Sequence, residues 1–432
     1  MSNSNATYWL DVQQGPVTSY PALAGTLDCD VCVVGGGIAG CSTALHLAQR
    51  GYRVTLLEQQ HIGFGASGRS GAQALFGLAV AQQKLEALIG AGAARQAFNI
   101  TVEGLALLKS LIATHDIDCD WTSGQLHVAM KPRQDRELQD WALQLQHRLQ
   151  YPSVSMLSRD ALRDYIASDR YTSALLDTNS GHLDPLRYTR GLARAAVMAG
   201  AHVFEHSRAR RYETRVGTPG AASSIRVETQ NGQVTCRQLV LCGNALLGAF
   251  APALATKIMA VGTYMVATEP LGAEQARALL PQNSAVADLN WVLDYFRRSA
   301  DHRLLFGGRV SYSGLDREYS SRATRKRMLA VFPQLAERRI DYCWGGNIDI
   351  TLNRAPHFGR LEPDVYFMQG FCGHGIVLAG MAGKLIAEAI AGTNERFDVF
   401  ARIPHRNFPG GDHLRRPALV LGMLWYRLRD WL

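Results

Sequence analysis

The first clear hydrophobic pattern lies between Cys29 and Glu58, where two apolar runs, CDVCVV and YRVTLLE, flank a glycine turn and an apolar stretch. The glycine turn is GGGIAG, and the stretch after it, CSTALHLAQRG, has the composition of a buried helix. The order of these segments predicts a strand, turn, helix, strand unit of about 30 residues.

Further along, apolar positions at helical spacing predict a mostly helical stretch from 79 to 150, interrupted by the strand-like GQLHVAM. Residues 225–244 predict a hairpin, because Asn231 and Gly232 form a strong turn signal between alternating flanks. Residues 255–330 predict a β-rich block with many aromatic and β-branched residues. Short strands and the helix GIVLAGMAGKLIAEAIAG follow.

These patterns predict an α/β chain, α+β overall, with a Rossmann-like nucleotide-binding domain and an inserted antiparallel β-sheet substrate domain. The α/β portions enclose the inserted segments in the sequence, so the domains are expected to be interleaved. The predicted segments are 28–78, 150–250 and 331–400 for nucleotide binding, 79–149 and 251–330 for the substrate domain, and 401–432 for a C-terminal tail or helix.

The glycine turn carries the first chemical signal. Gly35-x-Gly37-x-x-Gly40 follows a predicted strand, opens a helix, and is followed by Glu58 at the end of the next strand. The first glycine permits a tight turn, the second lets the backbone approach a pyrophosphate, and the third allows close helix packing. Glu58 can bind the ribose hydroxyls. The complete unit predicts a dinucleotide site.

A second match to the same spacing, at Gly63, Gly65 and Gly68, lies too close to Glu58 for another strand to precede it. It is therefore not a second Rossmann turn, and the sequence offers one dinucleotide site and none for NAD(P)H. That argues for a flavoprotein reoxidised by another acceptor. The small residues of GFGASGRSGAQ suit a close backbone approach to a flavin ring, although a flexible surface loop remains the alternative.

Composition narrows the class of protein. The chain has 432 residues, 47% hydrophobic and 19% charged, so it can bury a large core. The net charge of +8 is diffuse and does not require nucleic acid. The polar start and the lack of long apolar runs predict a cytoplasmic protein without a membrane span. Cys29 and Cys32, a C-x-x-C without a second pair, predict core packing and no metal site.

The chain resembles the FAD-dependent amine and amino-acid oxidases of the D-amino-acid oxidase and sarcosine oxidase type. The resemblance runs nearly end to end, through CDVCVVGGGIAG, HIGFGASGRSGAQ, SDRYTSALLDTNSGHLDP, LVLCGNALLG, WGGNIDITLNRAPHFGR and YFMQGFCGHGI. It implies an FAD cofactor with its ADP half on the glycine turn and its flavin beside the loop from Ser67 to Gln73. The pyrimidine edge of the flavin would meet GHGIV, which also precedes a helix whose N-terminus favours negative charge.

Carried over position by position, the resemblance implies one catalytic residue, His374, for which a capping or packing role is equally open. The implied cofactor-binding residues are Gly35, Gly37, Ile38, Ala39, Gly40, Glu58, Gln59, Gly65, Ala66, Ser67, Arg69, Ser70, Gly71, Ala72, Gln73, Ala209, Cys242, Gly243, Asn244, Gly346, Gly373, Gly375, Ile376 and Val377.

Three departures from the resembled family concern the substrate and the cofactor. The amino-acid oxidases have a carboxylate-binding arginine four residues after the W-x-G tryptophan, and counting from Trp344 places Ile348 there. The missing arginine favours an amine over an amino acid. Residues 293–313 lack the lysine that sarcosine oxidases use to activate oxygen. Cys343 precedes the tryptophan, out of register with the flavin-linking cysteine of those relatives, so non-covalent FAD is expected.

The implied reaction is oxidative deamination of γ-glutamylputrescine or a related glutamylated polyamine to aldehyde, ammonia and hydrogen peroxide. Trp291 and Tyr295 are candidates for an apolar amine pocket, and Arg309 for the distant carboxylate; core packing or a solvated surface remains the alternative for each. One alternative activity is a dehydrogenase that passes electrons to a quinone or carrier protein. Another is a tRNA-modifying flavoprotein, which the dispersed arginines disfavour.

Overall fold

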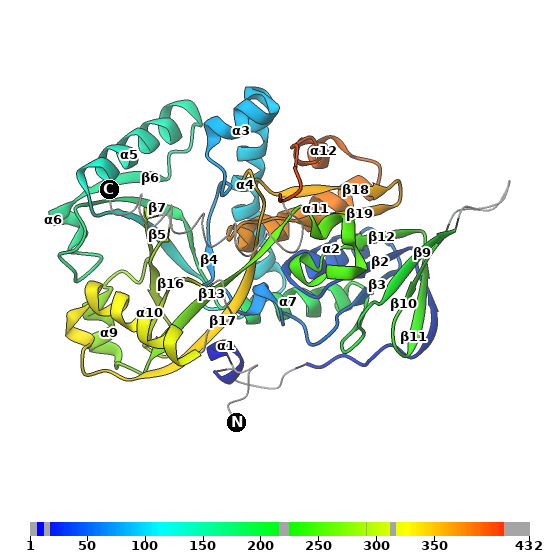
Figure 1. Cartoon of the computed structure of the whole chain (residues 1–432), viewed down its shortest axis with the longest axis horizontal. Helices are drawn as coiled ribbons and strands as arrows, with labels where there is room; N and C mark the ends of the chain where they lie inside the picture. Colours follow the sequence, from blue (N-terminus) through cyan, green and yellow to red (C-terminus); the bar gives the residue numbers. More distant parts are fainter. Residues whose placement is uncertain (1–6, 13–17, 216–223, 291, 312–316, 410–432) are drawn as a thin grey trace.

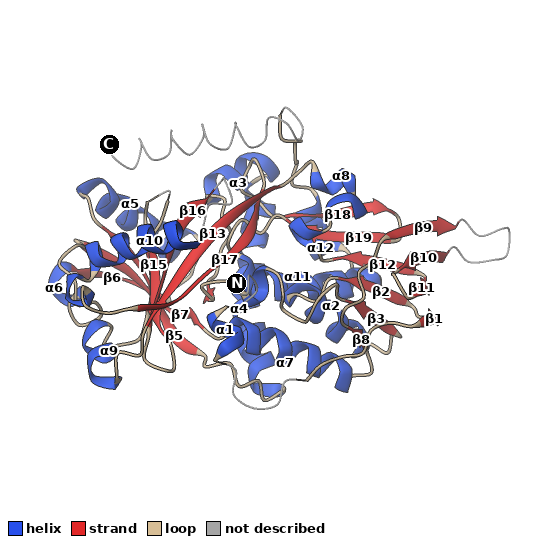
Figure 2. Ribbon diagram, turned by 60° about the horizontal axis from the view of Figure 1, so that its bottom comes forward, coloured by secondary structure: helices blue, strands red, loops and turns tan. Residues whose placement is uncertain are grey.

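A computed structural model describes residues 7–12, 18–215, 224–290, 292–311 and 317–409. The molecule is built on two large sheets, which lie at opposite ends of its long axis with α4 and α11 between them (Figures 1 and 2). The predicted α/β class is confirmed. Trp291 and the tail beyond residue 409 lie outside the described residues.

The nucleotide-binding half contains a six-stranded sheet that is parallel except for its edge strand β18. Its order is β18 (His357–Glu362), β19 (Val365–Gln369), β12 (Gln238–Leu241), β2 (Val31–Val34), β3 (Val54–Leu57) and β8 (His202–Phe204). Strands β2 and β3 are buried on both faces, which explains their continuous apolar sequence.

Two layers cover the six-stranded sheet. Helices α2 (Ile38–Ala48), α7 (Pro185–Met198) and α11 (Gly375–Ile390) pack together and share a core with Val31 and Val33. The other layer is a four-stranded sheet in the order β1 (Gly25–Asp28), β11 (Gly232–Cys236), β10 (Ser224–Glu228) and β9 (Arg211–Arg215). Strands β10 and β11 form the predicted hairpin.

Strand β2 begins at Val31, so Cys29 precedes it and Cys32 lies within it. Both cysteines are buried in the core between the six-stranded and four-stranded sheets, together with Cys236. A strand that included residue 29 would have pointed the two side chains to opposite faces, but β2 begins later and both lie in one core, so the predicted core packing is confirmed.

The other half contains a nine-stranded sheet, antiparallel except where β14 meets β5. Its order is β17 (Ile340–Ile350), β13 (Met259–Thr268), β16 (Leu304–Ser311), β15 (Tyr295–Arg298), β14 (Ala285–Asp288), β5 (Thr122–Ala129), β7 (Ser173–His182) and β4 (Gln73–Ala74), with β6 (Val154–Ser158) on β7. Alternation along β15 gives the sheet two distinct faces. Phe296 points into a core with Phe306 and Phe332, whereas Tyr295 and Arg297 lie against the loop around Gly71.

Sheet membership differs from the predicted segments at several places. Strands β6, β7 and β17 join the nine-stranded sheet, although their residues were assigned to the nucleotide-binding segments. The segment HVFEHSRARRYE has the composition of one strand, but it forms β8 and β9 in different sheets, and His206 between them has a positive φ of 50°. The expected β-rich block also contains helices α9 (Ala273–Leu279) and α10 (Arg317–Val331), which share the core of Phe296.

Helix α4 (Ala91–Thr114) is long and apolar enough to cross a bilayer by length and composition alone. In the structure it packs against α3 (Gln82–Ile89), α11 and α12 (Glu395–Ala401), and nine of its residues are buried. The remaining helices are α1 (Tyr8–Asp11), α5 (Pro132–Leu143), α6 (Arg159–Leu162) and α8 (Pro252–Ala255). The packing of α4 is that of a core helix.

The core of α2 contains a histidine that makes stability depend on pH. His46 is 6% exposed, and its Nε2 has no hydrogen-bond partner among the described residues. Burial, with a smaller contribution from Arg50, lowers the pKa of His46 to about 4. The unfolded chain therefore binds this proton near pH 6.5, whereas the folded chain excludes it until about pH 4. Stability is lost as the pH falls through this window.

We therefore predict that His46→Leu reduces the loss of unfolding free energy between pH 7 and pH 5 by roughly 2 kcal/mol. Urea unfolding at the two pH values measures this difference. The control is His147→Leu, which changes an exposed histidine and is expected to keep the wild-type pH dependence. An equal loss in wild type and His46→Leu would show that His46 is not the titrating group.

Candidate active site

The glycine turn between β2 and α2 has the geometry that a dinucleotide site requires. Gly35 has a φ of +114°, and a Cβ there would lie 2.8 Å from the Cys242 carbonyl carbon. A Cβ on Gly40 would lie 1.8 Å from the Gly35 carbonyl oxygen, so only glycine lets α2 approach the turn. At Gly37 a Cβ would meet the Ser67 Oγ at 2.8 Å, and this Oγ accepts the Ile38 N–H at 3.0 Å.

Glu58 directly follows β3 and is buried, with 7% of the residue exposed. Its two oxygens accept the Gly36 N–H at 2.7 Å and the Gln60 N–H at 2.8 Å. Burial raises the pKa of Glu58, and these backbone donors act in the opposite direction. The carboxylate is thus held at the glycine turn.

A pocket of about 470 Å³ opens between the turn and the four-stranded sheet. It brings together five predicted cofactor-binding residues from four separate parts of the chain: Gly35, Glu58, Gln59, Ala209 and Gly243. Arg208, Arg210, Gln230 and Phe250 complete its walls with residues that the sequence did not single out. The mixture of an acidic group, cations and an aromatic ring suits an adenosine with its phosphates.

The loop from Arg69 to Ala72 connects the turn region to β4. Its four consecutive carbonyl oxygens all accept hydrogen bonds from protein donors. The donors are, in order, the Trp344 indole N–H at 3.0 Å, the Trp9 indole N–H at 3.1 Å, the Arg297 guanidinium at 3.2 Å and the Leu183 backbone N–H at 3.2 Å. Each of these four carbonyl groups of the predicted flavin loop is therefore held by a donor of the protein.

The N–H groups of Ser70 and Gly71 have no acceptor among the described residues. Ser70 and Gly71 are only partly buried, so these donors are open to a ligand, and the nitrogen and oxygen atoms of a flavin ring can accept from them. A Cβ on Gly71 would lie 2.4 Å from the Tyr295 ring, so the loop lies directly against that side chain. These residues fit a flavin beside the loop.

Helix α11 begins at the predicted pyrimidine edge. His374 is its N-cap, and Gly373 before it has a φ of +87°. The loop before the helix is held by Asp349, a buried carboxylate that accepts the Gly370 N–H. The helix N-terminus thereby keeps a fixed direction, and its dipole favours negative charge in front of it.

Two half-buried histidines remain neutral near this helix end. Burial, with a smaller contribution from the Arg354 cation, lowers the pKa of His374 to about 4. Burial and then His374 itself lower the pKa of His127 on β5 to about 3. The sequence prediction included His374 and missed His127, whose only local signal is its place in the alternating strand GQLHVAM.

Of the three predicted substrate-binding residues, the structure describes the Tyr295 side chain and the backbone of Arg309. Tyr295 lies between Gly71 and Gly307, either of which would clash with its ring if it carried a Cβ, and burial raises the pKa of Tyr295 to about 12. The backbone of Arg309 lies on β16 opposite Tyr264. Ile348 is partly buried against Met259, Val261 and Phe408.

The remaining predicted cofactor-binding residues lie on the same turns, loops and helices. Gly65 and Ala66 precede Ser67, and Cys242 and Asn244 flank Gly243. A Cβ on Gly346 would lie 3.2 Å from the Arg69 Cβ. Ala39 lies on α2, Gln73 on β4, and Gly375, Ile376 and Val377 on α11. No group of three or more His, Cys, Asp or Glu side chains suited to a metal ion occurs among the described residues.

Together, these features are those of a dinucleotide-binding oxidoreductase. Residues 30–389 match the family model described as FAD dependent oxidoreductase. The chain is 41% identical to γ-glutamylputrescine oxidoreductase of Escherichia coli (strain K12) over 95% of each chain. It is 36% identical to the probable oxidoreductase OrdL of Haemophilus influenzae, covering 95% of this chain and 94% of that one.

The chain belongs to this family of FAD-dependent oxidoreductases, which confirms the predicted family and the FAD cofactor. The fold is similar to that of glycine oxidase from Bacillus cereus, with a TM-score of 0.70, 20% identity, and coverage of 88% of this chain and 99% of that one. It is also similar to L-proline dehydrogenase from P. horikoshii, with a TM-score of 0.69, 21% identity, and coverage of 85% and 94%. Non-covalent attachment stays a prediction.

The glycine turn gives a direct test of the cofactor site. We predict that Gly40→Ala weakens FAD binding at least about 100-fold, because the new Cβ forces α2 away from the Gly35 carbonyl. FAD titration of the apoprotein, followed by protein fluorescence, measures the dissociation constant. Gly92→Ala on α4 is the matched control, since a Cβ there meets nothing within 4 Å. Wild-type affinity in Gly40→Ala would contradict the assignment.

Proposed function

We propose that this protein is an FAD-dependent amine oxidase that acts on the primary amine of γ-glutamylputrescine or a closely related glutamylated polyamine. The products are an aldehyde, ammonia and hydrogen peroxide. The proposal is supported by the 41% identity to the γ-glutamylputrescine oxidoreductase of Escherichia coli over 95% of both chains. The chemistry that FAD supplies is acceptance of a hydride from the carbon next to the amine nitrogen.

The observation that carries the proposal is the aliphatic side chain at position 348. Related amino-acid oxidases have a carboxylate-binding arginine at the equivalent place after the tryptophan of β17. Here Ile348 contributes to an apolar cluster, and its Cδ1 lies 3.8 Å from the place of a Cβ on Gly373, next to the start of α11. An oxidised carbon with a carboxylate would therefore bring an anion to an apolar side chain.

The neutral histidines favour the reactive form of the substrate. A primary amine with a pKa near 10 is about one part in a thousand neutral at pH 7, and only that form has the lone pair needed for oxidation. His127 and His374 carry no charge at neutral pH, and the Arg354 cation lies near His374. The imidazoles thus add no negative charge that would stabilise an ammonium ion, and the Arg354 cation favours loss of its proton.

The residues of this chain would hold FAD and orient its flavin ring. Gly35, Gly37 and Glu58 would hold the ADP half, and the free N–H groups of Ser70 and Gly71 would bind the flavin edge. The N-terminus of α11 would stabilise the negative charge that a reduced flavin carries near N1 and the C2 oxygen. The electron acceptor that completes the cycle is oxygen in this proposal.

The proposal predicts that purified enzyme in air forms one peroxide and one ammonia for each γ-glutamylputrescine consumed. Acetylputrescine and putrescine are expected to react more slowly, and glycine not at all. Peroxidase-coupled and ammonia assays on the same samples measure the ratios. Turnover that requires an added quinone and forms no peroxide would show a dehydrogenase instead. Oxidation of glycine without oxidation of amines would contradict the proposal.

The γ-glutamyl carboxylate of the substrate requires a cation. Arg309 is the candidate, because β16 places its backbone opposite Tyr264 and two residues after Gly307, which packs on Tyr295. We predict that Arg309→Leu raises the KM for γ-glutamylputrescine roughly tenfold or more, and changes the KM for putrescine less than twofold. Arg298→Leu, whose Nε donates to Asn283 on the neighbouring loop, is the matched control. An equal change for both substrates would remove Arg309 from the site.

A further inference from the structure

Helix α1 is short, yet its aromatic side chains belong to the main hydrophobic core. Tyr8 and Trp9 are 2% and 3% exposed. Tyr8 stacks on Trp344 with ring centroids 6.1 Å apart, and Trp9 meets the same indole edge to face at 6.5 Å. In Figure 1, α1 lies below β17, whereas β2 and α2, which flank the glycine turn, lie further to the right.

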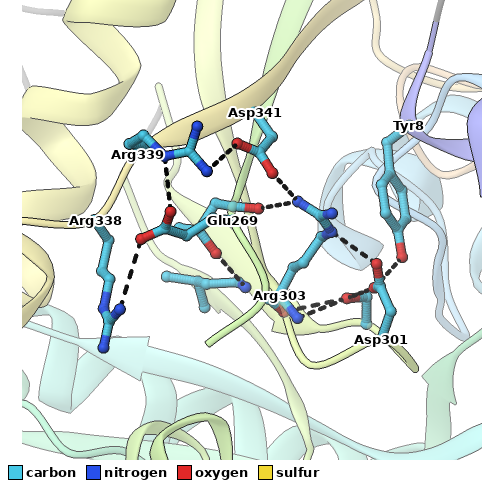
Figure 3. Close-up of polar contacts among 10 residues, drawn as sticks. Tyr8, Glu269, Asp301, Arg303, Arg338, Arg339 and Asp341 are labelled. Atoms are coloured by element: carbon cyan, nitrogen blue, oxygen red, sulfur yellow. Dashed lines mark hydrogen bonds and ion pairs between the residues drawn. The ribbon is translucent and has the colours of Figure 1, made fainter. Parts of the chain in front are cut away.

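Tyr8 anchors α1 to a charged network at the end of the nine-stranded sheet. Its hydroxyl donates to Asp301 at 2.6 Å, and Asp301 also accepts the Arg303 Nε at 2.7 Å. Arg303 then donates to Asp341 at 2.6 Å, and the network continues to Glu269 through Arg339 (Figure 3). Helix α1 is thereby fixed to the turn between β15 and β16, which contains Asp301, and through Arg303 to Asp341 on β17.

Trp9 connects α1 to the loop from Arg69 to Ala72. Its indole N–H donates to the Ser70 carbonyl at 3.1 Å, and the Arg297 guanidinium lies 5.0 Å from the centre of its ring. Arg297 is 3% exposed and donates to the next carbonyl, that of Gly71. Trp9 therefore contacts both the Ser70 carbonyl and the guanidinium group that donates to the Gly71 carbonyl.

The direction of one peptide group makes this contact important. The Ser70 carbonyl and the Gly71 N–H belong to the same peptide plane, so they point in opposite directions. A donor that holds the carbonyl inside the protein therefore aims the N–H outward. Gly71 lacks a Cβ, which lowers the cost of a rotated peptide. Without Trp9, the Ser70 carbonyl would be free to turn toward the cofactor.

We propose that α1 is a clamp on the flavin loop, and that Trp9 is a positioning residue that aims the Gly71 N–H at FAD. Trp344 performs the same task for the preceding peptide, whose carbonyl it holds at 3.0 Å. The proposal rests on the placement of the flavin beside this loop and not on the identity of the amine. Its test therefore uses no substrate.

The test is Trp9→Phe in the FAD-loaded enzyme, which keeps an aromatic ring and removes the N–H. We expect FAD release to become roughly five- to tenfold faster, because one oriented hydrogen bond to the flavin is lost. The visible circular dichroism of the bound flavin is expected to change as well. Release is followed by flavin fluorescence after dilution. Trp121→Phe is the matched control, since it removes an exposed N–H that donates to Ser123 at 3.2 Å.

The proposal would be overturned if Trp9→Phe released FAD at the wild-type rate and kept the wild-type visible circular dichroism. That holds even if the thermal unfolding midpoint of the variant falls. Should Trp9→Phe not fold, Tyr8→Phe tests the same clamp through its other anchor, with a smaller effect on both readouts expected. Unchanged readouts in Tyr8→Phe would then contradict the clamp. A failed amine assay with the expected flavin changes would refute the proposed function and leave the clamp standing.

Discussion

The four occupied carbonyls between Arg69 and Ala72 are the constraint that joins the two halves of the molecule. The loop leaves the nucleotide-binding half next to Ser67, which caps α2, and enters the nine-stranded sheet as β4. Its donors come from α1, β15 and β17 and from the residue after β7. Because each donor has a different place in the sequence, the direction of the loop depends on the whole fold.

This constraint explains how a fold that is common to several oxidoreductases provides a particular chemistry. In the proposed placement of the flavin, the loop and the start of α11 would supply backbone N–H groups to it, and neither contribution would depend on the substrate. Selectivity then depends on side chains at nearby positions. Ile348 makes one side of the region apolar, and the lowered pKa values of His127 and His374 keep the imidazoles neutral. A carbon that bears a neutral amine fits this setting better than one that bears a carboxylate.

The sequence predicted the parts of the site whose signals are local. Gly35, Gly40 and Glu58 were identified because a turn, a helix start and a strand end fall within one short unit, and the structure gives each glycine the close contact expected of it. Trp9 and Arg297 have no local signal, since they meet the loop across 61 and 226 residues of sequence. The sheet to which each strand belongs was harder to predict for the same reason. Strands β7 and β17 pair with distant strands, and only those partners show which sheet they join.

The account is tested most directly by anaerobic reduction of the flavin with two substrates that differ by one carboxylate. One is γ-glutamylputrescine, and the other is the same molecule with a carboxylate on the carbon to be oxidised, the δ-N-γ-glutamyl derivative of ornithine. Stopped-flow bleaching at saturating substrate gives the two rate constants. The account predicts that γ-glutamylputrescine bleaches the flavin at least about 100-fold faster, because Ile348 offers the extra carboxylate no partner. Equal rates, or a preference for the ornithine derivative, would contradict it.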